Sequence, residues 1–189
     1  MTEKQPFSSC AVVTIDIQMD YFPHGRFPLY RSRSALNRTR EILALARKAG
    51  IPVIHIRHCG TDPAGRFLVG ETKGTRLHPG LENEKYPEER VIVKHSPNSF
   101  MGTDLEECLK KLGVTQPVFA GMITWMCVDT TVRAARDLGF KPVLVHDACA
   151  SGWLLWKGLP VFPWLSHRAF MASLSHYHAK VVSARDVRF

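Results

Sequence analysis

The sequence lacks an apolar run long enough to cross a membrane as a helix. Such a helix needs about 18 or more consecutive apolar residues, and no run in the 189-residue chain approaches that length. The segment MTEKQPFSSCAVVTIDIQ at the N-terminus also lacks the basic start, long apolar region and small-residue cleavage site of a secretory signal. We therefore expect a cytoplasmic protein with no membrane partner.

Paired cysteines are also missing. The five cysteines are odd in number, widely spaced and free of any C-x-x-C motif: Cys10, Cys59, Cys108, Cys127 and Cys149. This pattern argues against a disulfide framework or a structural zinc site. We expect most of these cysteines to pack as small buried hydrophobes.

Acidic residues are scarce relative to basic ones. The chain has 25 Lys and Arg against 17 Asp and Glu, a net charge of +8, and five arginines fall between Arg26 and Arg40. Such a cluster can bind nucleic acid, but no recognition-helix or RNA-binding motif accompanies it. We favour a solvated helix face or a subunit contact and expect no nucleic-acid partner, while a basic field can attract an anionic substrate.

Strand and helix patterns alternate along the chain with no linker or repeat. The expected strands are residues 10–17, 51–58, 91–94, 117–121, 141–147 and 180–184, and the expected helices are 37–50, 103–113, 128–139 and 166–179. Thr103 with Glu106 predicts a capping box at the second helix. This alternation predicts a single α/β domain over residues 1–189, with a parallel sheet and helices on both faces.

Residues 59–90 carry little periodicity. A loop of that length is usually a lid, a binding loop or an oligomer contact, and the alternative is a disordered insertion. We favour an ordered loop because Phe67, Leu68, Val69 and Leu77 are apolar enough to pack.

Polar residues follow several of the predicted strands. Asp16 lies in TIDIQMDYF, Lys94 in VIVKHSPNSF, Cys127 after GMITWM, and Asp147 in LVHDACAS. Each has an ordinary explanation, such as a turn cap or a solvated side chain. The carboxyl ends of parallel strands meet at one sheet edge, however, and ligands of such sheets bind outside that edge. The occurrence of all four residues at one predicted edge of the sheet therefore indicates a functional site.

A cysteine nucleophile accounts for this set of residues. The thiolate is the attacking form, and making it the majority form at neutral pH needs a shift of roughly 1.5 pKa units, or about 2 kcal/mol. A helix N-terminus supplies only about 0.3–1 kcal/mol, so Lys94 or Asp16 must assist Cys127. Asp129 would oppose the thiolate, and we expect it to point away.

No histidine shows a local signature for pairing with the cysteine, although His95 and His167 remain possible partners. An Asp-Lys-Cys set solves the same problem differently. The carboxylate accepts the thiol proton, and the ammonium holds the carboxylate and stabilises negative charge. Backbone N–H groups at the turn can serve as an oxyanion hole.

The chain resembles the isochorismatase-like cysteine hydrolases from about residue 10 to residue 183. The matching segments are VVTIDIQMDYF, VIVKHSPNSFMGTDLEECL, VFAGMITWMCVDTTVRAARDLGF and VLVHDACAS. The resemblance implies a Rossmann-like three-layer α/β/α fold with a six-stranded parallel sheet in the order 3-2-1-4-5-6. It implies Asp16, Lys94 and Cys127 as the catalytic triad. It also implies a cis peptide between Met122 and Ile123, and an oxyanion hole formed by the N–H groups of Ile123 and Cys127.

The resemblance further implies hydrolysis of a carbon–nitrogen bond in a small amide-type substrate. Some members cleave a vinyl ether and generally do not need the cysteine, so Cys127 favours amide chemistry. The nicotinamidase branch usually has a D-x-H metal motif, whereas this chain reads HIRHCGTDPAG. His55 and His58 should face opposite sides of a strand, so we expect no metal and no other cofactor. Met19 stands where many members have Asn, which puts contacts near Asp20 in doubt.

Aromatic residues flank the predicted edge. Phe22, Phe100, Trp125 and Trp153, with Ile123, are the candidates for the substrate pocket, and the alternative is ordinary core packing. Members of the family are commonly dimers or tetramers, and the long loop or GWLLWKGLPVFPWL could supply the contacts. Two alternative functions remain open: an isochorismate-type vinyl-ether hydrolase, and a non-catalytic redox or partner-binding protein.

Overall fold

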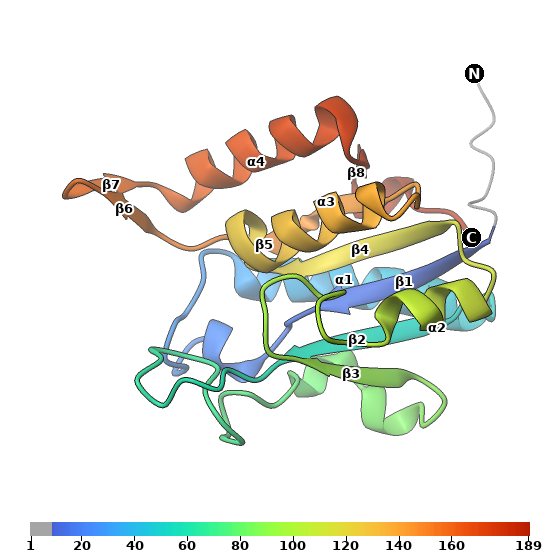
Figure 1. Ribbon diagram of the computed structural model, residues 1–189, viewed down its shortest axis with the longest axis horizontal. Coiled ribbons are helices and arrows are strands. Elements are labelled where there is room, and N and C mark those ends of the chain that lie inside the picture. The colour runs from blue at the N-terminus through green and yellow to red at the C-terminus, as the bar shows by residue number, and fades with distance from the viewer. Residues whose placement is uncertain (1–8) are drawn as a thin grey trace.

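The protein is built on one six-stranded parallel sheet, and the computed structural model describes residues 9–189 (Figure 1). The strand order is β3-β2-β1-β4-β5-β8, and every neighbouring pair is parallel. The strands are β1 Cys10–Ile15, β2 Val53–His58, β3 Arg90–Lys94, β4 Gln116–Met122, β5 Val143–Ala150 and β8 Lys180–Val182. The predicted fold class and strand order are confirmed.

Helices cover both faces of the sheet. They are α1 Ser32–Lys48, α2 Leu105–Lys111, α3 Asp129–Asp137 and α4 Pro163–Tyr177. Figure 1 shows α1 behind the sheet and the other three in front of it. Two apolar cores result, one including Ile42 and Leu43 of α1 and the other including Leu105 and Val132. The sheet is therefore buried on both sides, as continuous apolar strands require.

Several helix starts differ from the sequence prediction, and α4 begins at Pro163 instead of at residue 166. α1 begins at Ser32, after Arg31 in the left-handed conformation, rather than at residue 37. The predicted capping box of α2 is wrong, because the N-cap is Asp104 and its side chain caps nothing. Thr103 instead donates its hydroxyl to the carbonyl of Ser99 at 2.6 Å, which ties the helix to the loop after β3.

Residues 59–90 form an ordered segment that contains the short helices η2 Pro79–Leu81 and η3 Asn83–Lys85. The carboxylate of Asp20 anchors it, accepting from the backbone N–H of Leu68 at 2.8 Å. Gly74 packs against the same carboxylate, and a Cβ there would lie 2.1 Å from Oδ1. The segment is thus held by a buried charge from the loop after β1.

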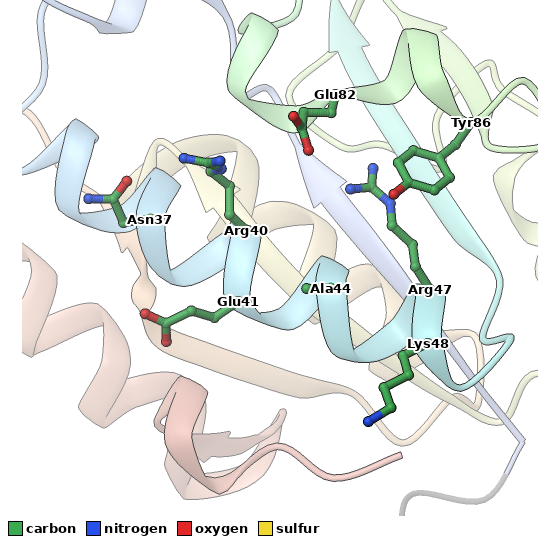
Figure 2. A pocket seen from close by; sticks show the side chains of 8 residues that line it. All are labelled: Asn37, Arg40, Glu41, Ala44, Arg47, Lys48, Glu82 and Tyr86. Atoms are coloured by element: carbon green, nitrogen blue, oxygen red, sulfur yellow. The ribbon is translucent and has the colours of Figure 1, made fainter.

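The far end of this segment is held by α1. Figure 2 shows Arg47 reaching from the helix to the ring of Tyr86, with its guanidinium carbon 3.8 Å from the ring centroid. Arg47 also pairs with Glu89 at 2.7 Å, and Glu89 bonds the buried His55 at 2.9 Å. This network fixes the approach to β3, and with it the strand that carries Lys94.

A two-stranded hairpin, β6 Leu154–Trp156 and β7 Leu159–Val161, was not expected from the sequence. It projects from the body of the molecule as an arm between β5 and α4 (Figure 1). Its large side chains face solvent, with Leu155 75% and Trp156 69% exposed.

Among the helices of residues 9–189, none combines the length and the apolar character that a membrane crossing requires.

Candidate active site

Four neighbouring strands deliver polar side chains to one edge of the sheet. Asp16 follows β1 directly, His58 ends β2, Lys94 ends β3, and Cys127 lies in the turn after β4. His58 and Lys94 are paired in register across β2 and β3. The strand ends therefore bring together residues that are up to 111 positions apart, counted from 16 to 127.

Asp16 and Lys94 form a buried ion pair beneath this edge. Oδ2 of Asp16 lies 2.9 Å from Nζ of Lys94, and both side chains have no exposed surface. Nζ also donates to the carbonyl of Pro97 at 2.7 Å. Burial opposes the charge of Lys94, but the interactions with the carboxylate of Asp16 and, to a smaller extent, with Cys127 outweigh it and raise the pKa of the ammonium. Lys94 is therefore a fixed cation.

Cys127 lies in a single π-helical turn, Thr124–Val128, that leads into α3. Its side chain is only 2% exposed. Burial and the adjacent Asp16 carboxylate raise the pKa of the thiol far above its ordinary value, and Lys94 offsets only part of that effect. The resting residue is thus a protonated thiol, because desolvation, which the sequence argument did not include, outweighs the help that Lys94 gives.

The turn before Cys127 depends on a close approach of two strands. Gly121 has φ of +147°, and a Cβ there would lie 2.1 Å from the carbonyl oxygen of Ile15. The peptide bond between Met122 and Ile123 is cis, at the position implied by the resemblance. Ile123 is fully buried. Its carbonyl accepts from the N–H of Val128 at 3.2 Å, which closes the wide turn around Cys127.

The two histidines considered as partners for the thiol bond other groups. Nδ1 of His167 lies 3.0 Å from the hydroxyl of Thr124. Burial, with His146 and Arg31 nearby, lowers the pKa of His167 to about 4. Nδ1 of His95 bonds the carbonyl of Cys59 at 2.6 Å. Both roles are local and structural.

The two further acidic residues singled out from the sequence lie outside this cluster. Asp129 points away, as expected, and accepts from Nε of Arg133 at 2.9 Å. Asp147 is a correction, because β5 continues three residues beyond it to Ala150. Its carboxylate accepts from the hydroxyl of Ser183 at 2.9 Å and the N–H of Ala184 at 2.8 Å, so it anchors the segment after β8.

The predicted pocket aromatics have different surroundings. Phe22 is buried against the ring of His78, with centroids 4.2 Å apart, and Phe100 stacks on Phe140 at 6.1 Å. Trp153 is 55% exposed, and its ring packs on that of Phe162, the N-cap residue of α4, with centroids 5.0 Å apart. Trp125 lies within the turn that carries Cys127 and donates to the carbonyl of Gly152 at 3.2 Å. A substrate-binding role for each of these aromatics stays a prediction.

His58 is the residue that the sequence reasoning missed. It was weighed only as a metal ligand with His55, yet its ring, Asp16 and Cys127 offer ligand atoms that lie within 4.8 Å of one another. Burial lowers the pKa of His58, with Asp16 opposing and Lys94 assisting that shift. The available signal was its position as the last residue of β2, between the strands that carry Asp16 and Lys94.

Comparison with known proteins gives consistent matches. The model of the isochorismatase domain matches residues 10–186. The uncharacterized isochorismatase family protein YddQ of Bacillus subtilis is 38% identical over 90% of this chain and 94% of its own length. A streptothricin hydrolase of Streptomyces noursei is 36% identical over 75% of this chain, which spans only 49% of that protein. The crystal structure of an isochorismatase from Pseudomonas putida superposes with a TM-score of 0.85, at 32% identity, over 97% of this chain and 93% of its own.

Proposed function

Because the chain belongs to the isochorismatase family, we propose that it is a cysteine hydrolase that cleaves a carbon–nitrogen bond of a small amide without a metal ion. The observation that carries this proposal is the buried Asp16–Lys94 ion pair beside the protonated thiol of Cys127. A carboxylate, an ammonium and a thiol in contact form a complete set for acyl transfer.

In the proposed acylation step, Asp16 takes the thiol proton as Sγ of Cys127 attacks the carbonyl carbon of the substrate. The carbonyl π bond becomes an oxyanion, which the N–H groups of Ile123 and Cys127 stabilise. The oxyanion then collapses, the carbon–nitrogen bond breaks, and Asp16 returns the proton to the leaving amine. The acyl group remains on Cys127 as a thioester.

In the proposed deacylation step, Asp16 is again a carboxylate and accepts a proton from an attacking water. The acid product leaves, and Sγ recovers the proton. Lys94 stays charged throughout, since its raised pKa keeps the proton in place. Its role is to hold Asp16 in position and to stabilise the transient thiolate.

The substrate side of the site is proposed around Trp125. Its ring belongs to the turn that carries Cys127 and is held by the bond to Gly152. A partly apolar wall of this kind suits a compact amide or a ring-bearing amide.

A screen of small primary amides and carbamoyl compounds for ammonia release tests this function. We expect at least one compound to be hydrolysed by the wild type and by Cys59→Ala, and to be left intact by Cys127→Ala. Release of pyruvate from isochorismate, at a rate unchanged in Cys127→Ala, would instead establish vinyl-ether hydrolysis. Full amide turnover by Cys127→Ala would overturn the proposed nucleophile.

A further inference from the structure

We propose that Asp16, His58 and Cys127 form a site for a thiophilic divalent cation, for which zinc is the best match, and that occupancy of this site blocks the nucleophile reversibly. Binding itself does not depend on the proposed reaction. Only the inhibitory consequence rests on it.

The spacing of the three donors suits one small ion. Their ligand atoms all lie within 4.8 Å of one another. Zinc bonds of about 2.0–2.3 Å in tetrahedral geometry place donors about 3.3–3.6 Å apart. Side-chain rotations that move the ligand atoms by little more than an ångström therefore bring them to the separation that one zinc ion requires. The strands that carry these residues need not move.

Two of the three proposed metal ligands have a buried atom that makes no hydrogen bond. Among the described residues, Oδ1 of Asp16 and Nδ1 of His58 belong to the few buried polar atoms with no hydrogen bond. Asp16 has no exposed surface, so water does not compensate for this loss. Oδ1 of Asp16 therefore has a lone pair free to bind a cation, and so does Nδ1 of His58 when the ring carries its proton on Nε2.

The surroundings of the His58 ring leave one of its nitrogens without a hydrogen-bond partner. The backbone of Ser96 raises the pKa of the ring, against the larger lowering effect of burial, while Nδ1 is a buried atom with no hydrogen bond. A metal-ligating histidine typically donates its other ring N–H to a carbonyl or carboxylate, which fixes the ring and leaves the free nitrogen directed at the metal.

Lys94 makes the site selective. Its ammonium occupies Oδ2 of Asp16 and repels any cation that relies on charge alone. Binding requires a metal–sulfur bond: Sγ of Cys127 gives its proton to water, and the sulfur electron pair forms the new bond. Thiolate and imidazole donors favour zinc over magnesium or calcium, so the hard cations should not bind.

Three protein ligands leave a fourth position open to water. With the metal bound, Sγ of Cys127 and the carboxylate of Asp16 are both engaged. The nucleophile and the base are then lost together, and a chelator restores both.

The test is a titration of the metal-free protein with Co²⁺ and with Zn²⁺ alone. We expect one Co²⁺ per chain with a near-ultraviolet thiolate-to-cobalt charge-transfer band, displaced by Zn²⁺ and unaffected by Mg²⁺. His58→Ala should weaken Zn²⁺ binding at least ~10-fold, and Cys127→Ser should abolish the band. The matched controls Cys108→Ala on α2 and His176→Ala on α4 should leave both measurements unchanged.

A second readout guards against variants that fold poorly. Zn²⁺ should raise the melting temperature of the wild type and of both controls, and should not raise that of His58→Ala. Absence of the cobalt band in the wild type would overturn the proposal, as would a band that persists in Cys127→Ser. Zn²⁺ affinity that is equal in wild type and folded His58→Ala would also overturn it. None of these outcomes depends on amide turnover, so failure of this site and failure of the proposed function are separable.

Discussion

The surroundings of the Cys127 thiol determine when it becomes reactive. Burial and Asp16 both favour the protonated form, and Lys94 favours the thiolate. In the proposed mechanism, the thiolate therefore forms only as the carbonyl carbon of the substrate arrives to share its charge, with Asp16 in place to take the proton. A buried, protonated thiol of this kind is protected from oxidation at rest, because oxidants react with thiolates.

The opposing charges next to Cys127 predict opposite pKa shifts in two variants. Asp16→Asn removes a negative charge that stabilises the protonated form, so the pKa of Cys127 should fall. Lys94→Met removes the cation that stabilises the thiolate, so the pKa should rise further. The ultraviolet absorbance of the thiolate against pH measures both shifts when each protein is compared with its Cys127→Ser counterpart.

In the wild type this absorbance should not develop until the pH is well above 9.0, the ordinary value of a cysteine thiol. A wild-type thiolate at neutral pH would contradict the account of burial. So would a pKa that rises in Asp16→Asn.

The sequence predicted which residues lie at the candidate site wherever it also predicted the end of a strand. Asp16, Lys94 and Cys127 follow β-branched runs, and a parallel sheet brings such positions together. Asp147 met the same criterion and was wrong, since a carboxylate within a strand can be used by a neighbouring backbone, here that of Ala184. His58 lies close to Asp16 and Cys127. This proximity depends on the register of the strands, which single residues do not encode.

At the scale of elements, the passage from β4 to α3 depends on Gly121. Its backbone lies in a region that suits glycine, and β1 leaves no space for a side chain. Gly121→Ala should lower the free energy of unfolding by about 3 kcal/mol or more through strain and overpacking. Urea unfolding measures the loss.

Gly113→Ala is the matched control for Gly121→Ala. Gly113 also has a positive φ, of +67°, but no atom lies within 4 Å of the position of its Cβ. This change should cost only about 1 kcal/mol, the usual penalty of a left-handed alanine. Equal losses in the two variants would contradict the steric account of the turn.

The type and order of the main elements were predictable, while several boundaries and the arm were not. Apolar β-branched runs give the sheet strands, but α1 begins early because tertiary burial of Ser32 and Ala35 extends it beyond its periodic part. The arm carries Pro160, which argues against a strand. Its turn signal was Lys157-Gly158, where both residues adopt positive φ, as a two-residue type I′ hairpin turn requires.

At the scale of the whole molecule, we propose that the arm and the start of α4 form a contact between copies of this chain. Large apolar side chains gather there with roughly half or more of their surface exposed: Trp153, Leu155, Trp156, Leu159, Phe162, Trp164 and Leu165. Contiguous exposed apolar surface of this kind is typical of interaction sites. A symmetric homodimer or homotetramer covers it with a second arm.

Removal of apolar surface from the arm should dissociate the assembly. We expect light scattering to report a dimer or tetramer for the wild type and a monomer for Trp156→Ser combined with Leu159→Ser. Leu112→Ser, at the end of α2 and 48% exposed, should keep the wild-type mass. A monomeric wild type, or an assembly that survives the double change, would contradict this contact.

The mass of the protein during turnover reports directly whether Cys127 forms a covalent acyl intermediate. The substrate is an amide found in the ammonia screen, and the reaction is quenched rapidly with acid. Intact mass spectrometry should then show an adduct with the mass of the acyl group, without the amine. Digestion should place this adduct on the peptide that carries Cys127. Cys127→Ala should show neither adduct nor ammonia. Steady turnover by the wild type with no adduct at any quench time, and equal turnover by Cys127→Ala, would contradict covalent catalysis by this cysteine.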